Sequence, residues 1–140
     1  MKNLIGISTV FLLSMLVVIG CGKNEEKPSG KVFISEPKDG GIVKSPFKVV
    51  MGVEGMTIKP AGEIVSGTGH HHLLINGDPI PAGTVIPNDD THKHFGKGET
   101  EATLELAPGD YKITLQFADG LHQSYGPEFS STINVKVVAP

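Results

Sequence analysis

Alternation of apolar and polar residues is the feature that most constrains the fold of this chain. In residues 111–117, YKITLQF, every second side chain is apolar. A period of two places successive side chains on opposite faces of a β-strand, so each such segment predicts a half-buried strand. The segments with this pattern are residues 47–53, 100–106, 111–117 and 133–137.

Turn-forming residues separate the predicted strands. Proline, glycine and aspartate cluster at residues 37–41, 108–110 and 119–120. The chain has 18 Gly and 10 Pro among 140 residues, and no helical period follows the N-terminal segment. We therefore predict one all-β domain over residues 31–140, a small immunoglobulin-like antiparallel β-sandwich. Residues 32–56 resemble the opening of bacterial immunoglobulin-like domains, with a strand, a turn and a second alternating strand.

The chain begins with a segment typical of exported proteins. Lys2 precedes a largely apolar run that ends at Gly20, so residues 1–20 predict a signal peptide. The order Val18, Ile19, Gly20, Cys21 resembles a bacterial lipobox, in which cleavage leaves a cysteine that carries a lipid. We therefore expect Cys21 to be a lipid anchor, with an uncleaved membrane helix as the alternative.

A short tether is expected between the anchor and the domain. Residues 21–30 are small, charged and without apolar periodicity, which predicts a flexible segment. The protein is then exported and membrane-anchored, facing the periplasm or the cell exterior. The residue after Cys21 is Gly22, and not the aspartate that is associated with retention in the inner membrane. This difference favours the outer membrane in a Gram-negative cell. Cys21 is the only cysteine, so no disulfide is expected.

Charge and residue usage argue against nucleic-acid binding. The formal net charge is −3, and all 12 basic residues are lysines. Nucleic-acid-binding proteins have a basic stripe and usually arginines that contact phosphate and guanine. We expect no nucleic-acid partner.

Three consecutive histidines occur in the stretch GHHHLLING, residues 69–77. On a strand, His70 and His72 point to one face, and His71 points to the other with Leu73 and Ile75. We expect His71 to be a core or boundary side chain whose ring nitrogen is paired with a carbonyl or carboxylate, rather than a ligand. Asn76 and Gly77 predict a tight turn after the strand.

A second histidine pair follows at His92 and His94, and His122 lies in a later loop. Two histidines at positions i and i+2 of a strand project side by side, so two such pairs can supply four nitrogens to one ion. Because loops gather at the ends of a sandwich, His122 is a further candidate. The predicted metal ligands are therefore His70, His72, His92, His94 and His122.

The ligand type narrows the predicted ion to copper or zinc. Imidazole suits copper, zinc or nickel, of which we expect copper or zinc, and no thiolate is available within the predicted domain. Met51 is a soft ligand, but it alternates with Val49 and Val53 and is expected in the core. Four acidic residues flank the second pair and are either hydrogen-bond acceptors for the imidazoles or a solvated loop: Asp89, Asp90, Glu99 and Glu101.

The histidine stretches carry a family resemblance. GTGHHHLLING, then HKHFGKGETEATLELAPGDYKITLQFADGLH, resembles the uncharacterised bacterial domain of unknown function 4399 family. The residues that match its pattern are Gly69, His70, His71, His72, His92, His94, Phe95, Gly96, Gly98, Thr100, Glu101, Leu106, Pro108, Gly109 and His122. The resemblance covers residues 32–138 and implies no established activity. The final loop departs from the pattern, with Gln123, Ser124 and Tyr125 where a second histidine and further prolines are expected.

Three functions are compatible with the sequence. The preferred one is a lipid-anchored exported binding module that holds copper or zinc through its clustered histidines. The second is a structural or protein-interaction module without metal, which binds an unidentified protein partner. The third, least favoured, is a copper oxidoreductase on a β-sandwich. No Gly-x-Ser-x-Gly stretch is present, so hydrolase activity has no support, and whether the protein is an enzyme stays open.

Overall fold

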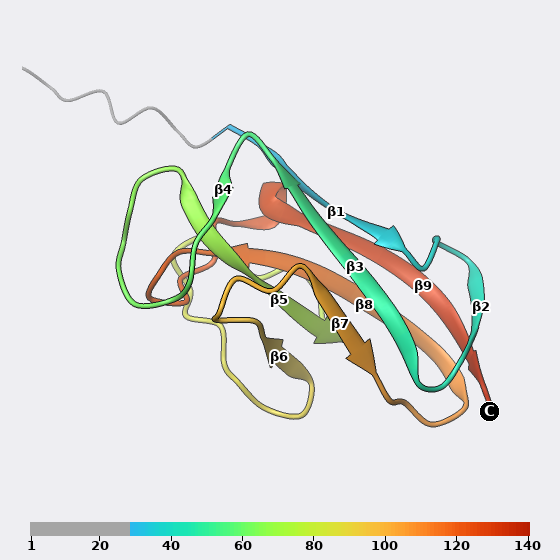
Figure 1. Ribbon diagram of the computed structural model, residues 1–140. Coiled ribbons are helices and arrows are strands. Elements are labelled where there is room, and N and C mark those ends of the chain that lie inside the picture. Colours follow the sequence, from blue (N-terminus) through green and yellow to red (C-terminus); the bar gives the residue numbers. More distant parts are fainter. Residues whose placement is uncertain (1–28) are drawn as a thin grey trace, which may run out of the picture.

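The computed structural model describes residues 29–140, and its strands form two packed β-sheets (Figure 1). The smaller sheet has the order β1-β3-β7. The larger sheet has the order β2-β9-β8-β5-β4, and β6 also pairs with β5. The strands are β1 (Lys31–Glu36), β2 (Gly41–Lys44), β3 (Phe47–Glu54), β4 (Thr57–Ile58), β5 (Thr68–Ile75), β6 (His92–His94), β7 (Glu101–Leu104), β8 (Gly109–Ala118) and β9 (Ser130–Val138). A 3-10 turn, η1 (Pro127–Phe129), precedes β9.

The all-β prediction is confirmed, with a correction to the strand directions. Most neighbours are antiparallel, but β2 runs parallel to β9 and β4 runs parallel to β5. Both exceptions are short strands at the edges of the larger sheet. The predicted turn at residues 108–110 is displaced, because β8 already begins at Gly109 and pairs with β9 from there.

The hydrophobic core lies between the two sheets. The larger sheet contributes the odd-numbered residues of β5, β8 and β9, and Val49 and Met51 of β3 face them from the smaller sheet. Met51 is 3% exposed, which confirms its predicted place in the core. The buried side chains of this cluster are Val32, Phe47, Val49, Met51, Leu73, Ile75, Leu104, Ile113, Leu115, Phe117, Phe129, Ile133, Val135 and Val137.

The other face of the larger sheet is covered in part by loops. Gln116 on β8 is fully buried there, and its side-chain oxygen accepts a hydrogen bond from the backbone of Ile80 at 3.0 Å. Its amide nitrogen donates to the carbonyls of Gly126 and Phe129 at 2.9 and 3.1 Å. Because its side-chain hydrogen bonds go to the backbone of Ile80, Gly126 and Phe129, Gln116 holds these two segments over the face on which His70 and His72 lie.

The segment after β5 is a long loop rather than a tight turn. Asn76 has a φ of 58°, but Gly77 has no positive φ, so the predicted two-residue turn is wrong. The Asn76 side-chain oxygen accepts a hydrogen bond from the backbone of Lys112 at 3.0 Å, which ends β5 against β8. Pro79 and Pro81 then prevent a paired return strand, because proline has no backbone donor.

The predicted signal peptide, the predicted lipid-anchor residue Cys21 and most of the predicted tether lie outside the described residues. Strand β1 begins at Lys31, where the domain was expected to start. Within residues 29–140, no helix has the length and apolar character needed to span a membrane.

The contacts of Gln116 predict that it stabilises the domain. In Gln116→Met, three backbone groups lose their partner, so the free energy of unfolding should fall by about 1–3 kcal/mol. Urea denaturation followed by circular dichroism measures this loss. Lys136→Met, at an exposed position of the neighbouring strand, is the control and should change stability by less than about 0.5 kcal/mol. Equal stability of the two variants would contradict the assigned role.

Candidate metal site

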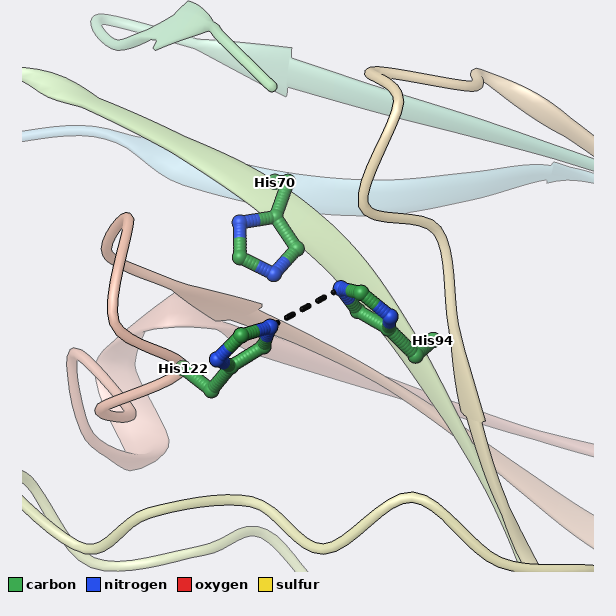
Figure 2. Close-up of side chains that lie close together, drawn as sticks. All are labelled: His70, His94 and His122. Atoms are coloured by element: carbon green, nitrogen blue, oxygen red, sulfur yellow. Dashed lines mark hydrogen bonds between the residues drawn. The ribbon is translucent and has the colours of Figure 1, made fainter. Parts of the chain in front are cut away.

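Four imidazoles from three separate parts of the chain converge on the loop-covered side of the larger sheet. Figure 2 shows three of them, His70, His94 and His122, with ring nitrogens directed toward one another. One nitrogen from each of these three lies within 4.8 Å of the others, close enough to hold one metal ion. His72 lies beside this group, with its Nε2 3.0 Å from Nε2 of His70, but it is not among the residues whose ligand nitrogens all lie within 4.8 Å of one another.

Strand register explains why three of the four rings meet. His70 and His72 are two residues apart on β5 and therefore project to the same face. In the antiparallel pair β5–β6, His94 lies directly opposite His72. On the other side of β5, Gln116 lies opposite His72 and Ala118 lies opposite His70. Hydrogen bonding on both sides therefore fixes the strand that carries the two buried imidazoles.

His122 reaches the same point from a tight loop after β8. Its φ is 66°, in the left-handed region that few residues other than glycine adopt. The loop is held by Asp119, whose carboxylate accepts hydrogen bonds from the backbone of Leu121 and Gln123 at 2.9 and 3.0 Å. The backbone oxygen of His122 also accepts from Ile86 at 2.9 Å. Strain at a residue held this firmly is typical of functional positions.

Two glycines explain the local sequence after His94. A Cβ on Gly96 would lie 2.2 Å from Cε1 of His94, so only glycine leaves room for that ring. Gly98 has a φ of 85°, and its backbone donates to the carbonyl of Phe95 at 3.2 Å. The Phe-Gly-x-Gly stretch therefore forms a turn that packs against His94.

The ring nitrogens make close pairwise contacts. Nε2 of His72 lies 3.0 Å from Nε2 of His70, and Nε2 of His122 lies 3.1 Å from Nε2 of His94. An N–H···N hydrogen bond between neutral rings accounts for each distance. Neighbouring ligands of one ion also account for them, because nitrogens bonded at about 2.0 Å to a tetrahedral ion lie about 3.3 Å apart.

The site favours neutral imidazoles. Burial, followed by the nearby rings of His94 and His122, lowers the pKa of His70 to about 4. Burial and the ring of His70 lower the pKa of His72 to about 2. The pKa of His94 is lowered for the same reasons, burial first and then His122. Neutral imidazole is the form that binds metal ions.

His92 lies apart from the other predicted ligands. In the pairing of β6 with β5, His92 lies opposite Leu74, whereas His94 lies opposite His72. The Nδ1 of His92 lies 2.9 Å from a carboxylate oxygen of Asp89. Among the described residues it makes no ring contact with the clustered histidines, which contact one another in every combination. The structure therefore brings together His70, His72, His94 and His122, and not His92.

His71 is buried on the opposite face, as its place in the alternation predicts. It is 0% exposed and packs against the ring of Phe117, with 5.2 Å between the ring centroids. Neither of its ring nitrogens has a hydrogen-bond partner among the described residues. The prediction of a hydrogen bond from His71 to a carbonyl or carboxylate is therefore wrong. Burial, followed by the ring of His70, lowers the pKa of His71 to about 4.

The acidic residues near the second histidine pair have other partners. Asp89 pairs with His92, Glu99 accepts a hydrogen bond from the backbone of Lys97 at 2.9 Å, and Glu101 pairs with Lys48 at 3.1 Å. None of the three accepts a hydrogen bond from the clustered imidazoles. Sequence reasoning missed Asp119, whose role depends on a loop conformation that the sequence pattern does not specify.

These features define a class: an all-β domain with a cluster of imidazoles on the loop-covered side of its larger sheet. Residues 49–138 match a family model described as Domain of unknown function (DUF4399), and the chain belongs to that family. The match contains all four clustered histidines, which confirms the predicted family over a slightly shorter range. No curated protein matches the chain.

One comparison concerns a solved structure. The domain is similar to part of the X-ray structure of the endo-beta-1,4-mannanase from Thermotoga petrophila, with a TM-score of 0.48 and 17% sequence identity. The similarity covers 84% of this chain and 22% of that chain, so this chain spans about a fifth of the enzyme's length. A similarity at this level indicates nothing about the site.

The lowered pKa values predict acid sensitivity of the metal-free protein. The unfolded chain takes up protons near the ordinary histidine value of 6.5, whereas folded His70 and His71 do so only near 4. The unfolded state therefore binds more protons in this window, and the free energy of unfolding should fall as the pH decreases from 6.5 to 4. The loss should be on the order of a few kcal/mol.

Urea denaturation in the presence of a chelator, repeated across this pH range, measures the acid sensitivity. His71→Leu places an apolar side chain against Phe117 and removes one titrating group. The free energy of unfolding should therefore depend less steeply on pH in this variant. A constant free energy of unfolding between pH 6.5 and 4 would show that these imidazoles are not kept neutral by the fold.

Proposed function

We propose that this domain binds one copper or zinc ion through His70, His72, His94 and His122. The observation that carries the proposal is the convergence of His70, His94 and His122, whose ligand nitrogens lie within 4.8 Å of one another, with His72 beside them. A folded chain gains nothing from gathering so many polar rings unless they have a common partner, because burying polar groups without hydrogen bonds is costly.

The energetic case for metal binding rests on the Nε2 atoms of His70 and His72, because their Nδ1 atoms stay unpaired with or without an ion. Nδ1 of His70 and Nδ1 of His72 are buried and have no hydrogen-bond partner among the described residues. If the two rings bonded only to each other, one would bury an unpaired N–H and the other an unpaired lone pair, with one weak hydrogen bond gained. A metal–nitrogen bond at each Nε2 offsets the cost of burying the same rings more fully.

The logic of lone pairs also includes His72 among the ligands. A metal-bound Nε2 carries no proton, so it neither donates nor accepts a hydrogen bond. If His70 binds an ion through Nε2, the nitrogen of His72 at 3.0 Å would face it without an attractive contact. Binding of both nitrogens to the same ion removes this repulsion, and a rotation of the His72 ring away from the ion also removes it.

The wider role we propose is that of an exported module held at a membrane by Cys21, with its metal site in the periplasm or at the cell surface. The N-terminal sequence supports this placement through its signal-like segment and lipobox-like residues. A structural or protein-interaction role without metal is the second candidate, which the His–His contacts also permit as hydrogen bonds.

Metal titration of the purified metal-free protein tests the proposal. Calorimetry with Zn(II), Cu(II) and Cu(I) should show one ion per chain and a bound form with a higher melting temperature, because a ligand of the folded state stabilises it. His94→Ala and His122→Ala, at the partly exposed side of the site, should each weaken binding by more than about 100-fold.

His92→Ala is the matched control for this titration. It removes a histidine from the same short strand as His94 but outside the cluster, so its metal affinity should equal that of the parent protein. Unchanged binding after replacement of all four clustered histidines by alanine would refute the site. Absence of binding by the parent protein would favour the structural or protein-interaction role.

Asp119 should support metal binding through the shape of its loop. Asp119→Asn retains a side-chain oxygen for the backbone donors of Leu121 and Gln123, so His122 should stay in place. The affinity should fall less than in Asp119→Ala, and only through loss of the negative charge that favours a cation at His70. Asp119→Ala removes both hydrogen bonds and should lower the affinity by about 10-fold or more. Equal affinities of the two variants, measured by competition with a chelating dye, would show that the loop contacts are not needed.

A further inference from the structure

We infer that the domain rests against the lipid surface of the membrane that carries its anchor, through exposed aliphatic side chains on three loop segments. This inference rests on the proposed function, which places a membrane anchor at Cys21, and it assigns the surface of the domain that meets the bilayer. The segments are residues 59–67, 83–86 and 119–124. Their exposed aliphatic side chains, which we call the apolar rim, are Ile64, Val65, Val85 and Leu121.

The apolar rim contains most of the exposed large hydrophobic side chains of residues 29–140. Five such side chains are exposed, and four of them belong to the rim, with exposed fractions of 37–60%. The fifth is Ile42, which is 71% exposed. Single exposed hydrophobic residues are ordinary on protein surfaces, whereas a concentration of them in one region marks an interaction surface.

The first and last of the three segments lie against each other. The backbone nitrogen of Gly62 donates a hydrogen bond to the carbonyl of Gly120 at 2.8 Å. Gly120 also packs directly against Glu63, because a Cβ on Gly120 would overlap the backbone of Glu63. Since Ile64 follows Glu63 and Leu121 follows Gly120, these two members of the rim belong to adjacent loops.

The remaining segment pairs with the loop of Leu121. Val85 forms an antiparallel bridge with Gln123, and the backbone nitrogen of Ile86 donates to the carbonyl of His122 at 2.9 Å. The three segments therefore lie side by side. Because Leu121 directly precedes His122, the apolar rim adjoins the candidate metal site.

The described chain starts at the same end of the sandwich as the rim (Figure 1). A Cβ on Gly30 would lie 3.2 Å from side-chain carbons of Met56 and Phe129, so the chain enters the domain beside these residues. Thr57 follows Met56, and its backbone nitrogen donates to the carbonyl of Gly67 at 2.9 Å. Gly67 ends the first segment of the rim, so the point of entry lies close to that segment.

The short chain between the proposed anchor and the domain keeps this end near the membrane. Residues 22–28 separate Cys21 from Ser29, and even a fully extended chain of this length spans at most about 29 Å. An uncleaved membrane helix, the alternative to the lipid anchor, would give nearly the same limit. A surface held this close to a bilayer meets lipid at a high effective concentration, so four aliphatic side chains need not bind strongly by themselves.

The charges near the rim are balanced, which favours an apolar contact over an electrostatic one. Lys59 pairs with Glu63 at 3.3 Å, and the Asp119 carboxylate accepts backbone hydrogen bonds within its own loop. Attraction to an anionic lipid surface needs a cluster of basic residues, which the three segments lack. Aliphatic side chains enter the boundary between headgroups and acyl chains instead.

Tryptophan fluorescence of the full chain in phosphatidylcholine vesicles tests the contact, with flotation in a density gradient to show anchoring. The chain has no tryptophan, so Ile64→Trp and Val85→Trp each place a single probe in the rim. Bromine atoms on the lipid acyl chains quench tryptophan at short range. We expect brominated lipid to quench both probes and their emission to be shifted to the blue, because interfacial side chains lie about 5–10 Å into the headgroup and acyl boundary.

Ile42→Trp is the matched control, since Ile42 is exposed but lies at the opposite end of the sandwich. Ile42 pairs with Lys136 near the end of β9, whereas Gly30 lies beside Phe129, directly before β9 begins. The two points are roughly 20 Å apart along the strand. We therefore expect no quenching of the Ile42→Trp probe.

A second substitution tests whether the segments of the rim act together. In the Val85→Trp chain, Ile64→Asp places a carboxylate at the contact, and burying this charge in lipid is costly. Quenching of the Val85→Trp probe should therefore decrease. Ile42→Asp in the same chain should leave the quenching unchanged.

The outcomes separate this inference from the proposed anchor. A chain that floats with the vesicles but shows no quenching at either rim probe, or equal quenching of Ile42→Trp, overturns the lipid contact, leaves the anchor intact and leaves the rim to a protein partner. A blue shift without quenching that grows with the number of chains per vesicle also overturns the lipid contact, because it assigns the rim to a second copy of the chain. A chain that does not float with the vesicles overturns both the anchor and the contact.

Discussion

The structure depends above all on the hydrogen bonding of β5 along both of its edges. Antiparallel pairing with β8 on one side and β6 on the other leaves seven of its eight residues buried. One face of the strand supplies Leu73 and Ile75 to the core between the sheets. The other face supplies two imidazoles to the histidine cluster. The same strand therefore contributes to both the hydrophobic core and the candidate site.

This arrangement separates two kinds of buried histidine within three residues. His70 and His72 meet other imidazoles, whereas His71 meets Phe117 and the core. All three are 0% exposed, so solvent does not distinguish them. Their neighbours do: Nε2 of His70 faces Nε2 of His72, whereas His71 packs against Phe117 and its ring nitrogens have no hydrogen-bond partner among the described residues. A shared sequence motif thus contains residues with different physical roles.

The alternation of apolar residues was sufficient to predict the strands, the core position of Met51 and the opposed faces of His70 and His71. It was insufficient to show that His92 lies outside the cluster. The pattern does not specify the register between β5 and β6, which places His94 rather than His92 opposite His72. Nor did it predict the parallel edge strands or the long loop after Asn76, which depend on contacts distant in sequence. The position of His122 required a left-handed residue held by Asp119, a conformation that leaves no periodic signal.

The clustered histidines also join parts of the chain that are far apart in sequence. His94 and His122 are 28 residues apart and in contact at their ring nitrogens, and both approach a strand that begins at Thr68. An ion bound by all four would act as a cross-link that closes these loops, as a disulfide does. In a chain with one cysteine, near its N-terminus, such a link would be the counterpart of a disulfide, and its strength would depend on the metal supply rather than on the redox state.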